Sequence, residues 1–284
     1  MIDLHCHTKI SDNSMTTEEV LKIAAARGVT HLAITDHDTT IGLREAERLG
    51  RVYGVEVIPG IEISAYDHRR KSRAHILGFF VTQGHEAIDK LCGSLREERH
   101  QTSFQMVQQI MAAGYNITWE EVIEYASGGT GVYKQHIMHA LLDKGYTDRI
   151  YGELYKTLFY RGSETRAPGI AFVPITYVDV KNAILAIKDA GGIPVLAHPG
   201  QFNSFDAVEE WVEAGLEGIE VEHPLHSHED KTKALELADR LNLVKTGGSD
   251  FHGFYSDADT SIGDYVTKVE WYEELKKRKT RLEV

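Results

Sequence analysis

The chain has 284 residues, and its 42% hydrophobic content is enough to build a substantial buried core in one or two domains. Lysine and arginine number 31 against 43 aspartate and glutamate, and the net charge of −12 argues against a stable nucleic-acid partner. Because the sequence has no apolar run of about 18 residues and no apolar leader, we expect no membrane association and a cytoplasmic location.

The first third of the chain alternates strand and helix patterns. Thr16 and Glu19 form a capping-box pattern that opens an apolar-periodic helix, and Gly28 marks its end. A second helix is expected after Thr40. Strands are predicted at 2–5, 30–35, 55–62 and 74–80.

The middle of the chain, 84–162, breaks this rhythm because it has helical stretches and no apolar β-run. The predicted helices are 95–113, 118–125, 135–144 and 148–159. We interpret 84–162 as a helical insertion domain that covers a substrate site, and 1–83 with 163–284 as the main domain.

The last third returns to the alternating pattern. Helices are predicted at 178–190 and 229–241, and strands at 193–197, 218–222 and 243–247. Strands that alternate with helices are typical of parallel β-α-β units, so the sequence predicts an α/β fold, either a doubly wound sheet or a barrel.

Chemistry-bearing residues begin at His5 and His7. Alternate side chains of a strand share a face, so these two imidazoles can chelate one metal. Two histidines at this spacing also arise by chance, and a structural role is an equal alternative for this pair alone.

The same residue types recur where other predicted strands end. In parallel α/β folds the loops after the strands converge on one face, so we expect these side chains to meet. A lone residue of this kind would more often be a cap or a loop hydrogen bond, but several strand ends with the same chemistry indicate a metal site. The residues are Asp12, Asp36, His37, Asp38, Glu62, His198, Asp250 and His252.

Imidazoles mixed with carboxylates favour two to three divalent Mn, Fe or Zn ions over a calcium or thiolate zinc site. Glu62, Asp12 and Asp250 are the carboxylates available to bridge two ions. Two close metals can lower the pKa of a bridging water towards neutrality and so supply a hydroxide. Neither the Gly-x-Ser-x-Gly motif nor the phosphate-binding loop motif occurs, so a side-chain nucleophile is not indicated.

The ordered motifs resemble the PHP family, named for polymerase and histidinol phosphatase. The resemblance extends from residue 1 to about 260 and keeps the order of the motifs. They are His5-Cys6-His7, Thr35-Asp36-His37, Gly60-Ile61-Glu62, Ala197-His198-Pro199-Gly200 and Gly248-Ser249-Asp250-Phe251-His252.

The resemblance implies a distorted (β/α)7 TIM-like barrel with a trinuclear metal centre. Asp36 is predicted to orient a ligand histidine, and a plain loop hydrogen bond is the alternative. His226 is the candidate for phosphate contact or proton donation, with a surface histidine as the alternative, and a core histidine is the alternative for His75. The implied ligands are His5, His7, Glu62 and Asp250 for the first metal, Asp12, His37 and His252 for the second, and Glu62, His75 and His198 for the third.

The substrate is predicted to be a small phosphorylated molecule. Lys134, His136, Arg161 and Arg166 are candidate substrate contacts, although solvated surface charges are the alternative reading of the cations. Lysine at position 134 lacks the bidentate fork of the arginine that related enzymes carry there, and this departure leaves the substrate open.

Three hydrolytic functions and one non-catalytic function are possible for such a site. The first is a phosphatase for a nucleotide 3′,5′-bisphosphate, another nucleotide or a sugar phosphate. The second is a phosphodiesterase that opens a cyclic phosphate and then removes it, and histidinol phosphatase is a third. A non-catalytic or proofreading-type module is disfavoured by the charge and the complete set of candidate ligands.

Overall fold

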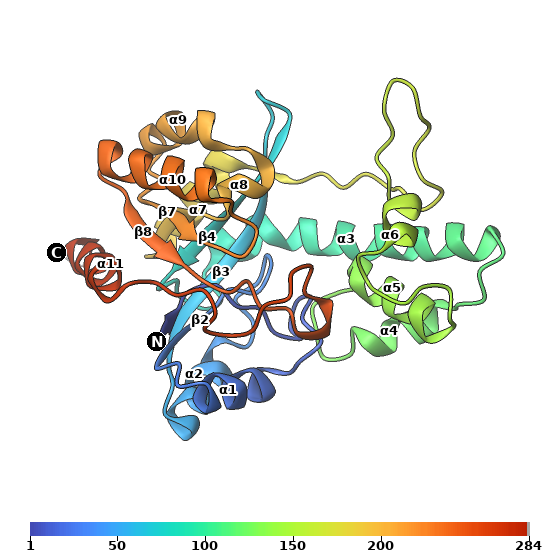
Figure 1. Ribbon diagram of the computed structural model, residues 1–284, viewed down its shortest axis with the longest axis horizontal. Coiled ribbons are helices and arrows are strands. Elements are labelled where there is room, and N and C mark those ends of the chain that lie inside the picture. The colour runs from blue at the N-terminus through green and yellow to red at the C-terminus, as the bar shows by residue number, and fades with distance from the viewer. Residues whose placement is uncertain (283–284) are drawn as a thin grey trace. The chain divides into compact units, whose positions relative to one another are not determined.

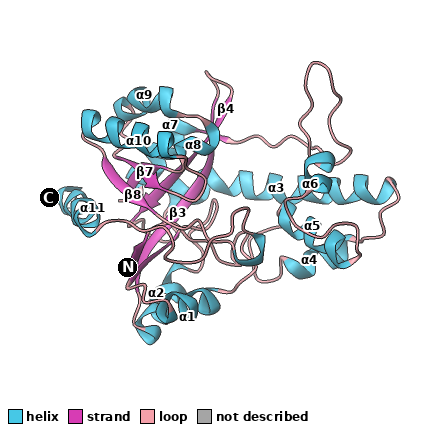
Figure 2. Ribbon diagram, in the orientation of Figure 1, coloured by secondary structure: helices cyan, strands magenta, loops and turns pink. Residues whose placement is uncertain are grey.

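The computed structural model describes residues 1–282. An eight-stranded sheet runs in the order β1-β2-β3-β4-β6-β7-β8, and β5 pairs with β3 (Figures 1 and 2). The strands are β1 (Ile2–Asp3), β2 (His31–Ile34), β3 (Glu56–Asp67), β4 (Ser72–Phe79), β5 (Val178–Asp179), β6 (Ile193–Leu196), β7 (Gly218–Glu222) and β8 (Val244–Gly247).

The two ends of this sheet approach each other. The Leu4 amide donates to the carbonyl of Gly247 at 3.1 Å, and Cys6 forms a parallel bridge with Phe251. The sheet is therefore nearly closed and barrel-like, and the predicted α/β barrel is confirmed.

The expectation of parallel strands throughout was wrong for β4. β3 continues beyond its predicted end to Asp67, and β4 returns antiparallel to it after a short turn. The Asp67 carboxylate accepts the backbone amides of Arg69 and Arg70 at 2.9 and 3.1 Å, which closes this turn. Because no helix separates the two strands, the connection is a hairpin, which requires antiparallel pairing.

The helices outside the middle segment flank the strands, with α2 on β3, α7 on β4 and α10 on β7 (Figure 1). The capping box at Thr16 and Glu19 is present, with both reciprocal hydrogen bonds. These helices are α1 (Thr17–Ala26), α2 (Leu43–Tyr53), α7 (Val180–Asp189), α8 (Pro199–Phe202), α9 (Val208–Glu213), α10 (His228–Leu241) and α11 (Val269–Leu282), with 3₁₀ turns at Phe205–Ala207 and Gly253–Tyr255.

Strand residues alternate between two buried apolar clusters, as side chains of a pleated strand must. Leu32 of β2 packs in one cluster with residues from the flanking helices. Ala33, its neighbour, packs in the other cluster together with Tyr272 and Leu275 of α11. Thus α11, which follows the last predicted element, completes the second cluster.

The chain divides into two compact units, the first made of Met1–Gly93 and the chain from Tyr177 onward, the second of Ser94–Thr176. The second unit is helical and contains most of α3 (Glu86–Ala112), then α4 (Trp119–Tyr125), α5 (Lys134–Asp143) and α6 (Glu153–Leu158). The predicted boundaries at 84 and 162, and the covering role of this segment, stay predictions.

Helix α3 begins nine residues earlier than its predicted start at Leu95. Gly93 and Ser94 lower helix propensity there, which explains the later predicted start. Ile88, Cys92 and Leu95 are nevertheless buried, and their spacing of four and three residues places them on one helix face. No helix among residues 1–282 is long and apolar enough to cross a membrane.

Candidate metal centre

All of the predicted metal ligands lie in the first unit, and they come together. His5 and His7 follow β1, His37 follows β2, and Glu62 and His75 lie on the paired strands β3 and β4. The remaining predicted ligands are Asp12 from the loop after His7, His198 after β6, and Asp250 and His252 after β8.

The first group consists of His5, His7, Glu62 and Asp250, whose potential ligand atoms all lie within 4.8 Å of one another. Asp250 Oδ1 lies 3.3 Å from His5 Nε2 and 3.2 Å from His7 Nε2. Glu62 Oε2 lies 3.1 Å from His7 Nε2. This group is the ligand set expected for the first metal.

The second group brings Asp12, His37 and His252 together as expected, and it also includes His7. His252 Nε2 lies 3.3 Å from Asp12 Oδ1, and His37 Nε2 lies 3.7 Å from Asp12 Oδ2. The rings of His7 and His252 stack with centroids 4.1 Å apart. His7 therefore belongs to both the first and the second group.

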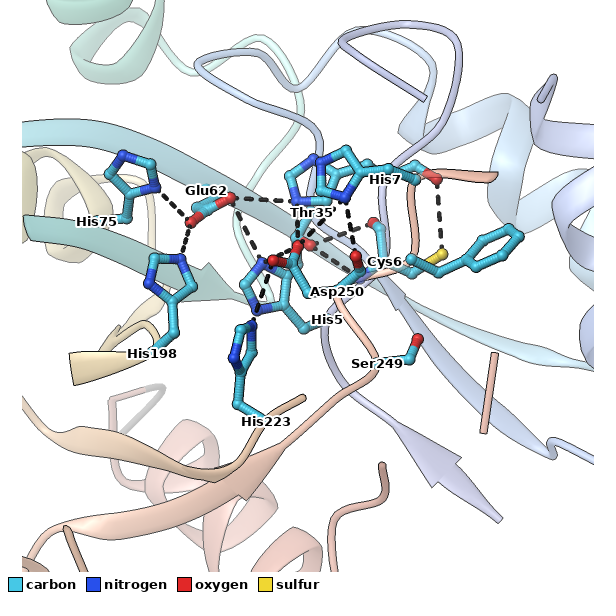
Figure 3. A network of polar contacts seen from close by, with 12 residues as sticks. His5, Cys6, His7, Thr35, Glu62, His75, His198, His223, Ser249 and Asp250 are labelled. Carbon is cyan, nitrogen blue, oxygen red and sulfur yellow. Dashed lines mark hydrogen bonds and ion pairs between the residues drawn. The ribbon is translucent and has the colours of Figure 1, made fainter. Parts of the chain in front are cut away.

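Glu62 lies at the centre of the cluster, and Figure 3 shows His75 and His198 converging on its carboxylate. Its Oε1 is 2.8 Å from His75 Nδ1 and 2.9 Å from His198 Nε2, and its Oε2 is 3.2 Å from His37 Nδ1. The side chain is 1% exposed. One buried carboxylate thus contacts members of all three expected ligand sets, which is the geometry that a bridging ligand needs.

The residues fit divalent metals on their own chemistry. Within residues 1–282, several buried atoms of the cluster have no hydrogen-bond partner, among them His5 Nε2, His7 Nε2 and Asp250 Oδ1. Buried polar atoms are costly unless they are paired or bind an ion. The donors are imidazole nitrogens and carboxylate oxygens, the set that Mn, Fe and Zn accept.

The carboxylates of the cluster stay ionised. Burial raises the pKa of Asp12, Glu62 and Asp250, but the surrounding histidines outweigh burial and lower the pKa of each. For His7, burial lowers the pKa, yet Asp250 and Glu62 outweigh it and raise the pKa to about 10. The ionised carboxylates therefore favour a positive charge at this position, either a proton on a histidine such as His7 or a bound cation.

Two of the candidate ligands have a backbone conformation that non-glycine residues rarely adopt. The φ angle is +25° at His198 and +49° at Asp250. The Asp250 amide donates to the carbonyl of His5 at 2.9 Å, and the His198 amide donates to Glu220 Oε2 at 2.8 Å. These bonds hold strained strand ends in place, as is common at functional sites.

Asp36, predicted to orient a ligand histidine, contacts the loop that leads to Asp12. Its carboxylate accepts from the Thr8 amide at 2.8 Å, the Thr8 hydroxyl at 2.7 Å and the Ser11 hydroxyl at 2.6 Å. Ser11 Oγ lies 3.5 Å from His7 Nδ1. Asp36 therefore supports the loop between two candidate ligands, and a role in the chemistry stays a prediction.

Both ring nitrogens of His226 contact the backbone. Nδ1 donates to the Val221 carbonyl at 2.8 Å, and Nε2 accepts from the Gly200 amide at 3.2 Å. The ring is 7% exposed and ties the loop after His198 to β7. Its predicted role as a phosphate contact or proton donor stays a prediction.

The other predicted substrate contacts belong to the second unit. Lys134 Nζ lies 5.1 Å from the centre of the Phe159 ring, and the Arg166 guanidinium lies 4.5 Å from that of Tyr160. His136 is buried, and its Nδ1 accepts the Tyr133 amide at 3.0 Å. Arg161 is exposed. Whether any of these four residues contacts a substrate stays a prediction.

Two residues that touch the cluster were not identified from the sequence. Glu220 lies at 3.0 Å from His5 Nδ1, and His223 Nε2 lies at 3.2 Å from Asp250 Oδ2. Both are fully buried. Glu220 lies between apolar residues in β7. A carboxylate inside a short buried strand needs a partner, and this position could have indicated from the sequence that Glu220 belongs to the site.

Comparison with known proteins agrees with this geometry. The model of the PHP domain matches residues 3–163. A phosphoribosyl 1,2-cyclic phosphate 1,2-diphosphodiesterase from Eggerthella lenta is 46% identical over 251 residues, covering 88% of this chain and 94% of that protein. A 3′,5′-nucleoside bisphosphate phosphatase from Chromobacterium violaceum is 32% identical over 256 residues, covering 88% of this chain and 87% of that protein.

A solved structure has the same fold over nearly the whole chain. It is that of a protein from Bifidobacterium adolescentis assigned as a metal-dependent phosphoesterase. It superposes with a TM-score of 0.87 at 28% sequence identity, over 97% of this chain and 95% of that one.

Proposed function

This chain belongs to the PHP domain family, and from that premise we propose that it hydrolyses a cyclic phosphate diester on a small phosphorylated sugar. Its general class, a metal-dependent phosphoesterase that acts on small phosphate esters, was predicted and is confirmed. The proposal concerns the substrate, the number of metals and their identity. We also propose the cytoplasm as its location.

Similarity favours the cyclic diester over the bisphosphate. The relative named for a cyclic phosphate is 46% identical, and the one named for a bisphosphate is 32% identical over a segment of similar length. The sequence alone suggested the opposite order, with the bisphosphate before the cyclic diester.

The observation that carries the proposal is the contact of one carboxylate, Glu62, with three groups of candidate ligands. We propose that these groups hold three divalent ions of Mn, Fe or Zn. Bound there, such ions supply Lewis acidity toward the phosphate oxygens and lower the pKa of bound water. The carboxylates and imidazoles contribute fixed positions and negative charge, because they are buried and mutually bonded.

Hydrolysis of a cyclic diester joins a water oxygen to phosphorus and breaks one ring P–O bond, and the released alkoxide takes up a proton. The product is a monoester that keeps its phosphate in the same place. A second water can then bond to the same phosphorus and break the remaining P–O bond to the sugar, whose oxygen takes up a proton as inorganic phosphate is formed. One site can therefore both open the ring and remove the phosphate.

The second candidate substrate is a nucleoside 3′,5′-bisphosphate. The observation in its favour is the similarity to the Chromobacterium violaceum phosphatase over 88% of the chain. It requires cationic side chains for the second phosphate, and Lys134, Arg161 and Arg166 are the residues proposed for that task.

The deciding experiment compares kcat/KM of the manganese-loaded protein for four substrates. They are the 1,2-cyclic phosphate of ribose 5-phosphate, the corresponding monoester, adenosine 3′,5′-bisphosphate and histidinol phosphate. We expect the cyclic diester to be consumed fastest, with the monoester as a transient. A protein that hydrolyses the bisphosphate and leaves the cyclic diester intact would refute the proposal, and Asp250→Asn is the inactive control.

A further inference from the structure

Strand β7 carries none of the predicted metal ligands, yet its end contacts three segments that do. Glu220 contacts the end of β1 at His5 and the end of β6 at His198, and His223 contacts Asp250 after β8. Glu220 is fully buried. Burial of an unpaired charge is costly, so a buried carboxylate needs partners, and these contacts supply them.

Each oxygen of the Glu220 carboxylate has its own partner. Oε1 lies 3.0 Å from His5 Nδ1, and Oε2 accepts the backbone amide of His198 at 2.8 Å. Because Oε2 accepts the His198 amide and Oε1 faces a ring nitrogen that can donate, both oxygens act as hydrogen-bond acceptors.

An acceptor at this position decides which ring nitrogen of His5 carries the hydrogen. Nδ1 faces Glu220 and must donate, so in the neutral ring Nε2 keeps its lone pair. Nε2 points to the centre of the cluster, 3.4 Å from Glu62 Oε2 and 3.3 Å from Asp250 Oδ1 (Figure 3). The contact thus presents the lone pair of His5 where the first metal is proposed.

His223 orients Asp250 by a similar contact. Its Nδ1 accepts the Leu225 amide at 3.2 Å, so its Nε2 carries the hydrogen and donates to Asp250 Oδ2 at 3.2 Å. Figure 3 shows His223 directed at this carboxylate. Asp250 Oδ1 is left facing His5 and His7. The end of β7 therefore orients two ligands of the same group.

We propose that Glu220 is a positioning residue of the metal centre: it holds His5 in the Nδ1–H tautomer and fixes the β6 end that carries His198. The inference rests on the metal centre proposed above and adds a residue that acts through a ligand. Carboxylates bonded to metal-binding histidines raise the basicity of the ring and fix its orientation, and their loss typically costs about 10- to 100-fold in metal affinity.

The first test replaces Glu220 by glutamine, which has nearly the same size. An amide has one accepting oxygen and one donating nitrogen, so it cannot accept from both His5 and the His198 amide. The matched control is Glu222→Gln, two residues along the same strand, where the carboxylate is 31% exposed and pairs with Lys231 at 2.6 Å. Zinc affinity of the metal-free proteins is measured by competition with a chromophoric chelator.

We expect Glu220→Gln to bind zinc about 10- to 100-fold more weakly than the wild type, and Glu222→Gln to bind it as the wild type does. Equal affinity of Glu220→Gln and the wild type would overturn the positioning role and leave the proposed function standing. A wild type that binds no zinc would remove the metal centre and the inference together.

A second measurement observes the tautomer of His5 in the wild-type protein itself. In zinc-loaded wild-type protein with ¹⁵N-labelled histidine, NMR distinguishes a ring with hydrogen on Nδ1 from one with hydrogen on Nε2. The His5 resonances are assigned by their loss in His5→Gln. We expect Nδ1–H on His5 with zinc on Nε2, and the opposite tautomer would overturn the proposal.

Discussion

Glu62 Oε1 and His198 Nε2 lie 2.9 Å apart although 136 residues separate them in the chain. The same oxygen contacts His75, and the other oxygen faces His37 and His7. Glu62 therefore contacts members of all three expected ligand sets, and its replacement is expected to affect more than one metal.

Glu62→Gln is expected to lower bound metal by more than one equivalent and kcat/KM by more than about 100-fold, beyond the loss typical of a residue that acts through a ligand. Elemental analysis and hydrolysis assays of the purified protein measure both. Glu56→Gln is the control, since Glu56 lies on the same strand and is 65% exposed. A Glu62→Gln protein with full metal content and activity would contradict the bridging role.

Replacement of His226 by alanine is expected to destabilise the fold by about 1–3 kcal/mol, because the Val221 carbonyl and Gly200 amide lose their buried partner. Urea unfolding measures this change. We expect kcat/KM to fall by a similar factor for esters with good and poor leaving groups. A loss confined to poor leaving groups would support the alternative, in which His226 donates a proton to the departing oxygen.

The cations of the second unit give a prediction on substrate choice. One charge-assisted contact contributes roughly 1.5–3 kcal/mol, so its loss should lower kcat/KM by about 10- to 150-fold. Lys134→Ala, Arg161→Ala and Arg166→Ala are expected to show this loss for a doubly phosphorylated substrate and little change for a singly phosphorylated analogue.

Lys156→Ala is the control for these variants, because Lys156 is 69% exposed and pairs with Glu153. Steady-state kinetics on both substrates decide the outcome. Equal losses on both would mean that the residue supports the fold or holds the reacting phosphate, and no loss for any of the three would exclude their contact with a second phosphate.

Glu210 gives a prediction on pH. Hydrogen bonds from Lys181 and Arg70 lower its pKa from 4.5 to about 2. A carboxyl group whose pKa is lower in the folded state contributes stability above its unfolded pKa, and this stability is lost as the pH falls through the folded value. Wild type should therefore be more stable than Glu210→Gln at pH 6, and the difference should shrink by pH 3.

Urea unfolding of both proteins at the two pH values measures this difference. Glu236→Gln on the exposed face of α10 is the control for the substitution itself. Because the ion pairs of Glu210 with Lys181 and Arg70 are at the surface, 1 M salt should also reduce the stability difference between the two proteins at pH 6. A difference that grows toward pH 3 would contradict the assigned sign.

The sequence by itself determined most of the strands, most helices and most residues of the cluster of candidate ligands. Each of these depends on local pattern: His5 and His7 share a face through the two-residue period of a strand, and Thr16 and Glu19 cap a helix three residues apart. Candidate ligands such as Asp250 and His252 were recognisable because they follow an apolar strand within a few residues. In parallel α/β folds such positions converge, whatever the details of packing.

Only the tertiary structure decided the pairing of β3 with β4 and the role of β7. The period of apolar residues is the same in parallel and antiparallel strands, so the hairpin that brings His75 to Glu62 depended on the turn at Asp67. Glu220 meets His5 across 215 residues of chain. A hydrogen bond between side chains so far apart in the sequence depends on the closure of the sheet, and no local pattern encodes it.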